Sequence, residues 1–170
     1  MIFVYTCVYN TAMVIYEVVQ VLNKYKLKYA IVGGYALALH GLVRATIDVD
    51  LVLSLKLADF ELAESALAEI GLQSRLPIRA QDVIKMRREY IENRNLLAWS
   101  FVDFKKPHRQ VDILITHDVR KMDTQVMSFG GKKITVISLK ELLKMKVKAG
   151  RPQDLVDAEN IKEKLNEKES

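Results

Sequence analysis

The stretch AIVGGYALALHGLVRATIDVDLVLS, residues 30–54, combines the apolar character of buried strands with two carboxylates, Asp48 and Asp50. Residues two apart on a strand point to the same face, so Thr46, Asp48 and Asp50 are expected to share one face while Ile47 and its apolar neighbours anchor the other. Adjacent carboxylates repel each other, and desolvation increases that cost. The pattern indicates a Mg²⁺ site, because Mg²⁺ prefers carboxylate oxygens. An exposed edge strand with a solvated polar face is the alternative, since short motifs recur by chance.

The glycines of this stretch indicate what such an ion would carry. Gly33 and Gly34 follow a short apolar strand and precede a short helix that is expected to end at Gly41. Because they lack side chains, they let a phosphate approach the backbone N–H groups at a helix N-terminus. A Gly-Gly pair alone is more often a tight turn. A phosphate-binding turn beside paired carboxylates is the combination that a nucleoside triphosphate with Mg²⁺ needs.

A third carboxylate on a neighbouring strand would complete a site for two ions. Two-metal phosphoryl or nucleotidyl transfer holds its ions about 3.5–4 Å apart and needs ligands that bridge them. Asp112 lies in the apolar run QVDILIT and is the first candidate, and Asp103 in FVDF is the competitor.

The rest of the chain alternates between expected helices and strands. Helices are predicted over about 10–26, over 57–71, where apolar residues recur at helical spacing, and over 80–95. Paired strands are predicted over 96–104 and 109–116, followed by a hairpin over 125–138 around Gly130-Gly131. Ser138 and Glu141 form a capping-box pattern for a helix that ends at Gly150, and Pro152 begins a last helix. We therefore expect an α/β (α+β) class, with a mixed β-sheet flanked by helices and a short helical C-terminal segment.

Composition limits the class of protein. A chain of 170 residues with 50% hydrophobic and 28% charged residues suits a single folded domain over 1–170, whose helical tail spans 138–170. One cysteine, Cys7, excludes an intrachain disulfide and a multi-cysteine zinc site. The net charge of +5 favours polyanions such as nucleotides or RNA only mildly.

The apolar N-terminal stretch has neither a basic n-region nor a signal cleavage site, and Glu17 and Gln20 argue against a membrane span. A cytoplasmic protein with no membrane partner is expected. Residues 1–12 are predicted to form an extended arm, or a non-native extension if Met13 is the true start.

The stretch VGGYALALHGLVRATIDVDLVL resembles the signature of the DNA polymerase β-like nucleotidyltransferase superfamily: a hydrophobic residue, Gly-Gly, a spacer, Asp-x-Asp and a later acidic residue. The spacer here runs from Tyr35 to Ile47, thirteen residues, at the long end of the family's range. The form of the motif most resembles the minimal nucleotidyltransferases that include AbiEii-type toxins. The tail LLKMKVKAGRPQDLVD is similar to the same group's C-terminal motif, so the resemblance spans about 29–157.

The resemblance implies a role for each matched residue. Asp48 and Asp50 would bind the Mg²⁺ that carries the triphosphate, and Asp112 would complete the second metal site and help to activate the acceptor hydroxyl. Gly33 and Gly34 would cradle the phosphates. Arg44 would orient Asp48 or touch phosphate, unless it is a surface arginine, and Thr46 is expected to give a supporting hydrogen bond. In the tail, Lys146 and Arg151 would lie near the triphosphate, and Asp154 would pair with one of them. Composition alone favours a solvated, lysine-rich helix for this tail.

The implied function is Mg²⁺-dependent transfer of a nucleoside monophosphate from a nucleoside triphosphate such as ATP to a hydroxyl acceptor, on tRNA or protein if the chain is a toxin with an antitoxin partner. An aminoglycoside-type small-molecule nucleotidyltransferase is the alternative enzyme, and a nucleotide-binding module without turnover is the alternative of another class. A complete carboxylate set argues against the last, because unneeded buried charges are costly. His40, in an apolar helix, is interpreted as a structural histidine.

Overall fold

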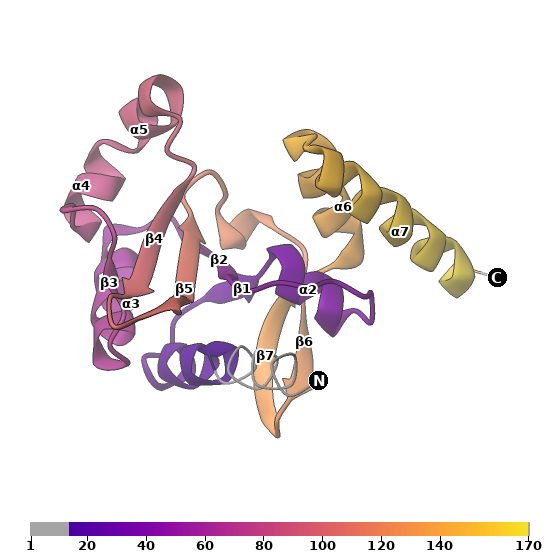
Figure 1. Ribbon diagram of the computed structural model, residues 1–170, viewed down its shortest axis with the longest axis horizontal. Helices are drawn as coiled ribbons and strands as arrows, with labels where there is room; N and C mark the ends of the chain where they lie inside the picture. The colour runs from indigo at the N-terminus through magenta and orange to yellow at the C-terminus, as the bar shows by residue number, and fades with distance from the viewer. Residues whose placement is uncertain (1–13, 170) are drawn as a thin grey trace.

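The fold is built on one mixed sheet, as a computed structural model that describes residues 14–169 shows (Figure 1). Within those residues seven strands pair in the order β3-β4-β5-β2-β1-β7-β6. The β1–β7 and β2–β5 pairs are parallel and the other pairs are antiparallel. The strands are β1 (Tyr29–Ile31), β2 (Val49–Leu53), β3 (Gln73–Ser74), β4 (Ala98–Asp103), β5 (Lys106–Leu114), β6 (Thr124–Phe129) and β7 (Lys132–Ile137).

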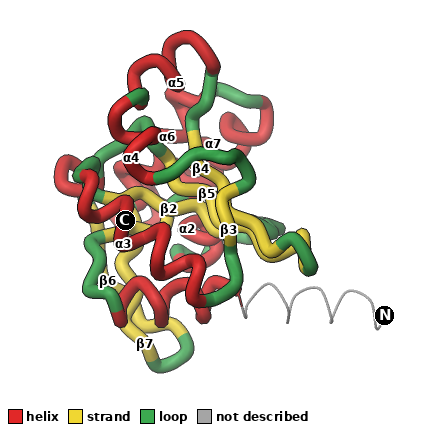
Figure 2. Tube along the Cα trace, turned by 90° about the vertical axis from the view of Figure 1, so that its left-hand side faces the viewer, coloured by secondary structure: helices red, strands yellow, loops and turns green. Residues whose placement is uncertain are grey.

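Helices pack against this sheet, and Figure 2 shows β2, β4 and β5 near the centre of the molecule with the β6–β7 hairpin below them. Residues 14–24 are helical. They are followed by α2 (Gly33–Leu39), α3 (Leu57–Glu69), α4 (Ala80–Lys85), α5 (Arg87–Arg94), the 3₁₀ turn η1 (Val119–Lys121), α6 (Leu139–Ala149) and α7 (Pro152–Glu169). The C-terminal helices α6 and α7 pack side by side, on the opposite side of the view from α4 and α5 (Figure 1). The predicted mixed sheet with flanking helices and a helical C-terminal segment is confirmed.

Alternation along the central strands separates a core face from a polar face. Val49 and Leu51 of β2 are fully buried, as are Val111 and Ile113, their partners on β5. Trp99 of β4 lies on this face too, stacked on Phe60 of α3 with ring centroids 6.1 Å apart. The intervening residues of β2, β4 and β5 point to the other face of the sheet.

Several local predictions hold. The hairpin turns at Gly130 and Gly131, both with positive φ, between β6 and β7. The Ser138 hydroxyl accepts a hydrogen bond from the backbone N–H of Glu141 at 3.3 Å, and Gly150 ends α6 in the left-handed region. These caps satisfy backbone groups that the helix itself leaves without partners.

Two predicted elements differ from the structure. The helix expected over 80–95 is two helices, because the backbone departs from helical geometry at Met86, after which the Arg87 side chain donates to the carbonyl of Ile115 at 2.5 Å. The second strand of the opening stretch begins at Val49, so Asp48 lies in the preceding bend. The preceding residues pass over α2 instead of pairing, and Ile47 is 52% exposed, so it does not anchor the core face as predicted.

The predictions for residues 1–13, namely the extended arm and the alternative start, lie outside the described residues. Among the helices that are described, none has the length and apolar character that crossing a membrane requires.

Candidate active site

The strand register brings Asp50 and Asp112 together. Asp50 of β2 pairs directly with Asp112 of β5 in parallel register, so the two side chains leave the sheet on the same face. Both side chains are half-buried, while their neighbours along each strand are fully buried in the core. The carboxylates predicted from separate motifs therefore stand side by side.

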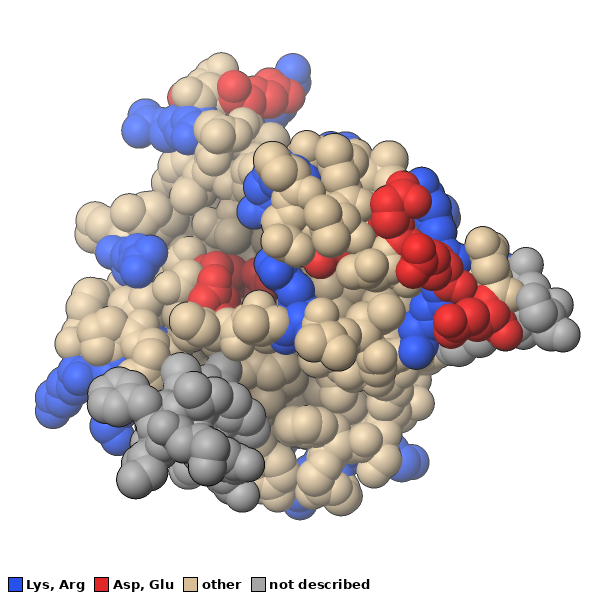
Figure 3. All heavy atoms as spheres, turned by 45° about the vertical axis from the view of Figure 1, so that its right-hand side comes forward, with Lys and Arg blue, Asp and Glu red and all other residues tan. Residues whose placement is uncertain are grey.

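Electrostatics within this group are unfavourable without a counter-charge. Burial, followed by the nearby carboxylates of Asp112 and Asp48, raises the pKa of Asp50 to about 7. Lys146 and Arg151 partly offset this rise. Burial, followed by Asp112, also raises the pKa of Asp48, and the Arg75 guanidinium opposes that rise. Figure 3 shows acidic side chains set in a hollow with basic side chains beside them.

The chemistry of these donors suits a hard divalent cation, because Mg²⁺ prefers carboxylate oxygens. Oδ2 of Asp112 accepts a hydrogen bond from the Gln110 side chain at 3.0 Å, whereas Oδ1 is buried without a hydrogen-bond partner among the described residues. A buried acceptor without a partner is costly, and an ion or a bound donor would satisfy it. In the described part of the chain, no three acidic, histidine or cysteine side chains are grouped closely enough to hold an ion as they stand.

The two glycines make close contacts with this group. Gly33 has φ +64°, and a Cβ there would lie 1.9 Å from Oδ2 of Asp50, so only glycine fits against that carboxylate. A Cβ on Gly34 would lie 2.6 Å from the side chain of Thr46. Gly34 thus lets residues 42–48 cross the first turn of α2. The Thr46 hydroxyl donates to the carbonyl of Asp48 at 3.4 Å.

A buried ion cluster joins α6 to α7. Nζ of Lys146, which is only 8% exposed, lies 2.8 Å from Oδ1 of Asp154 and 2.8 Å from Oδ2 of Asp157. Arg151 also pairs with Asp154, at 2.5 Å, so Asp154 neutralises both predicted cations rather than one. Hydrogen bonds from the two cations lower the pKa of Asp154 even though burial acts against them. The solvated-helix alternative is therefore wrong for Lys146.

Arg44 faces this cluster. Its Nε, which is buried without a hydrogen-bond partner among the described residues, lies 3.8 Å from Oδ2 of Asp157, the oxygen that also pairs with Lys146. Arg44 thus joins the segment that leads to Asp48 to the C-terminal helices. Neither of the roles predicted for Arg44 included this contact.

The competing candidates belong elsewhere in the fold. Asp103 pairs with Arg109 at 2.7 Å, and this hydrogen bond lowers its pKa, so it forms part of a structural ion cluster with Glu17. His40 is buried: Nε2 lies 2.7 Å from the carbonyl of Ile137, so it donates there, and Nδ1 accepts from the Gln125 amide at 3.2 Å. The interpretation of His40 as structural is confirmed.

Four residues at the site were missed from the sequence: Arg75, Ser100, Gln110 and Asp157. Gln110 and Ser100 carry a detectable signal, because each is polar at a position where the strand alternation predicts the face of Asp112. Arg75 and Asp157 carry none, since a loop arginine and an acidic residue in a charged helix are typical of any surface.

No protein-family model and no curated protein sequence matches the chain. Solved structures resemble it over most of its length. The crystal structure of ANT(2'')-Ia in complex with adenylyl-2''-tobramycin matches with a TM-score of 0.58 at 11% identity, over 89% of this chain and 87% of that one. The lincosamide antibiotic adenylyltransferase LnuA matches with a TM-score of 0.61 at 13% identity, over 88% and 95%.

A putative nucleotidyltransferase from Thermotoga maritima matches with a TM-score of 0.56 at 17% identity, over 91% of this chain and 92% of that one. None of these likenesses singles out the AbiEii-type group. At such low identities they establish the fold alone, and the chain has a nucleotidyltransferase-like fold.

Proposed function

We propose that the chain is a Mg²⁺-dependent nucleotidyltransferase that moves a nucleoside monophosphate from a nucleoside triphosphate to a hydroxyl acceptor. The observation that carries this proposal is the direct cross-strand pairing of Asp50 with Asp112 beside Gly33. A fold keeps adjacent, half-buried carboxylates at a cost in stability, and perturbed groups of this kind cluster at functional sites. The nucleotidyltransferase-like fold supports the reaction class.

The reaction is an in-line displacement at the α-phosphorus. The acceptor oxygen forms a new bond to phosphorus, the bond to pyrophosphate breaks, and the hydroxyl proton leaves with a base. Asp112 suits the role of base, because its Oδ1 has no hydrogen-bond partner within the described residues. Asp48, Asp50 and Asp112 would hold Mg²⁺, which supplies charge to stabilise the developing negative charge on the phosphoryl oxygens.

Asp48 lies in a bend outside the regular strand, and we infer that its side chain turns toward the other two carboxylates when an ion is present. The triphosphate would lie toward the C-terminal helices. Lys146 and Arg151 both act on Asp50 electrostatically. The side chain of Arg151 is exposed, so it could contact a phosphate group. Backbone N–H groups at Gly33 and Gly34 would cradle the phosphates beside Asp50.

The acceptor we favour is a small hydroxylated molecule, with ATP as the donor. Two structures of the same fold are described as adenylyltransferases or adenylyl complexes, one bound to lincomycin and one to adenylyl-2''-tobramycin. This favours the small-molecule alternative over tRNA or protein, and no comparison supports an antitoxin partner.

The test is label transfer from each α-³²P-labelled nucleoside triphosphate, with Mg²⁺, to a panel of aminoglycosides, lincosamides, phosphorylated sugars, tRNA and total protein. Asp50→Asn and Asp112→Asn should each abolish transfer, while the matched Asp103→Asn variant should retain it. Transfer that persists in Asp50→Asn would refute the catalytic assignment. Nucleotide binding without transfer to any acceptor would instead favour a binding module without turnover.

A further inference from the structure

The sheet carries a polar row that extends past the carboxylates toward β3. Asp112 pairs with Ser100 on β4, so Ser100 leaves the sheet on the same face as Asp112. In the bend just beyond β3, the backbone N–H of Arg75 donates to the carbonyl of Ser100 at 2.9 Å, which holds Arg75 beside Ser100. Asp50, Asp112, Ser100 and Arg75 therefore follow one another across four chain segments.

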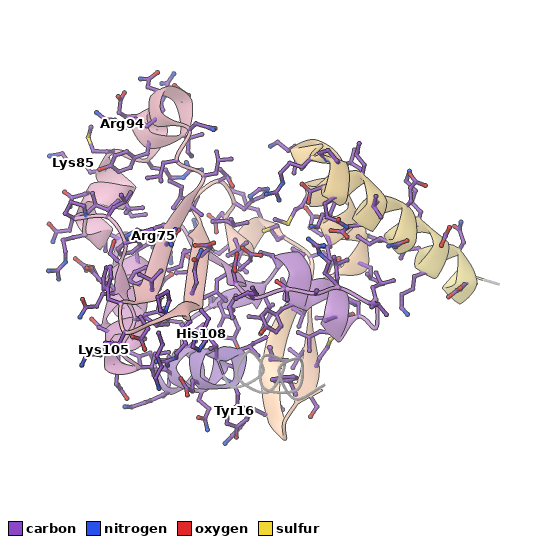
Figure 4. The ribbon with its side chains drawn as sticks, viewed as in Figure 1. Tyr16, Arg75, Lys85, Arg94, Lys105 and His108 are labelled. Carbon is purple, nitrogen blue, oxygen red and sulfur yellow. The ribbon has the colours of Figure 1, made fainter. Side chains whose placement is uncertain are left out.

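The surroundings of Arg75 indicate which way its side chain extends. Ser74, the residue before it, accepts a hydrogen bond from Nε1 of the buried Trp99 at 2.8 Å, so Ser74 points to the core face. Arg75 lies in the bend that follows β3, and its guanidinium acts electrostatically on Asp48, so its side chain extends toward the carboxylates. Figure 4 labels Arg75 toward the β3 end of the sheet, away from α6 and α7.

Arg75 is exposed, and among the described residues it forms no ion pair. Its charge nevertheless acts on Asp48, where it partly opposes the rise in pKa that burial causes. Lys146 and Arg151 act on Asp50 from the side of the C-terminal helices. The carboxylates thus have basic groups on two different flanks, and the proposed triphosphate site uses only one of them.

In-line displacement decides what the second flank faces. The nucleophile must approach the α-phosphorus from the side opposite the leaving pyrophosphate. If pyrophosphate lies toward Lys146 and Arg151, the acceptor hydroxyl enters over β5 and β4, where Ser100 and Arg75 follow Asp112. A guanidinium there matches a phosphate group through paired hydrogen bonds, whereas it would repel a polycation.

Resting on the proposed function, we propose that Arg75 and Ser100 form an acceptor subsite that binds a phosphate group of the acceptor, near the hydroxyl that is modified. The acceptor is accordingly a phosphate-bearing hydroxyl compound and not a polycationic aminoglycoside. Arg75 is a specificity-determining residue in this assignment, and Ser100 donates a second hydrogen bond. The phosphate could belong to a small ester or to an RNA backbone, which share this chemistry.

The experiment compares ligands that differ only in phosphate. The full chain, with Mg²⁺ and with or without a non-hydrolysable ATP analogue, is titrated with ribose 5-phosphate, with ribose and with tRNA, and binding is measured by calorimetry. Ribose 5-phosphate should bind more tightly than ribose, and Arg75→Gln should weaken its binding about tenfold or more. Arg75→Lys should recover part of the loss, because a charge remains without the planar fork.

Lys105→Gln is the matched control, since it removes one exposed positive charge from the β4–β5 turn, about 20 Å along β5 from Asp112. It should leave ribose 5-phosphate binding unchanged. An Arg75-dependent effect seen only with tRNA would assign the subsite to a polymer, and one seen with ribose 5-phosphate would assign it to a small ester.

Equal binding of both phosphate ligands to wild type, Arg75→Gln and Lys105→Gln would overturn the proposal. Binding of the ATP analogue is read on the same samples. Its absence would count against the proposed function, while titrations without the analogue still decide the role of Arg75.

Discussion

The cost of placing Asp50 beside two other carboxylates can be measured by replacing it with asparagine. Asn has nearly the shape of Asp and no charge, so Asp50→Asn removes the ionisation of this group and little packing. We expect Asp50→Asn to stabilise the metal-free protein above pH 7 and to leave its stability nearly unchanged below pH 4. The proposed catalytic role of Asp50 would account for this cost, because active-site groups often lower the stability of the fold in exchange for activity.

The magnitude follows from the pKa of Asp50, which rises from 3.8 to about 7 on folding. Between these values the native state binds a proton that the unfolded state has released, so the free energy of unfolding falls as pH rises. Each pKa unit corresponds to about 1.36 kcal/mol, so a difference of about 3 removes about 4 kcal/mol in all. This loss in the free energy of unfolding begins near pH 4 and is complete above pH 7. Asp50→Asn does not undergo it, because asparagine does not ionise.

The assay is urea denaturation at pH 4, 6 and 8.5, in EDTA and in Mg²⁺. In EDTA, the free energy of unfolding of Asp50→Asn should exceed that of wild type by an amount that grows with pH. In Mg²⁺ this difference should shrink, because the ion stabilises only the ionised wild-type site. Asp118→Asn is the control of opposite sign, since a hydrogen bond from Arg120 lowers the pKa of Asp118 to about 2 and makes its charge stabilising. An effect of Asp50→Asn that does not vary with pH would show that ionisation of Asp50 does not cost the fold stability.

Two further substitutions test the site's surroundings. Gly33→Ala should abolish Mg²⁺-dependent ATP binding in calorimetry, because its Cβ would overlap the Asp50 carboxylate. The control is Gly131→Ala, at a position with positive φ and open space around it, which should only destabilise the fold by about 1 kcal/mol. Unchanged ATP binding in Gly33→Ala would contradict the close contact. Lys146→Met should lower the free energy of unfolding by about 3–5 kcal/mol, because it leaves two buried carboxylates without their shared cation. A loss below about 1 kcal/mol in urea denaturation would show that water reaches those carboxylates.

The sequence predicted the parts of the fold that local chemistry decides. Gly150 ends a helix because it adopts positive φ, and Ser138 begins that helix because its hydroxyl caps a backbone N–H. Pattern did not predict the break at Met86, since residues 80–95 contain neither glycine nor proline. The Arg87 side chain that follows the break contacts the carbonyl of Ile115, which is distant in the sequence.

The candidate site was predictable only as far as strand alternation reaches. Period two puts Asp50 and Asp112 each on the polar face of its own strand, but their direct pairing is a register between segments about sixty residues apart, which no local pattern encodes. The bend at Asp48 follows a segment in which Thr46 packs against Gly34, a contact that no local pattern shows. The burial of Lys146 was hidden for a related reason, because a lysine-rich helix does not reveal which lysine faces a partner helix.

The arrangement of cations around the carboxylates connects these observations. Lys146 is held by two aspartates in a buried cluster, so its position is fixed before any ligand binds. Arg75 lies on an exposed segment without an ion pair within the described residues, so it can adjust to a ligand. A nucleotidyltransferase needs the same triphosphate geometry in every turnover, while its acceptor decides its biological role. The rigid flank therefore suits the nucleotide, and the exposed flank suits the acceptor, which makes Arg75 the residue whose replacement should change specificity without changing ATP affinity.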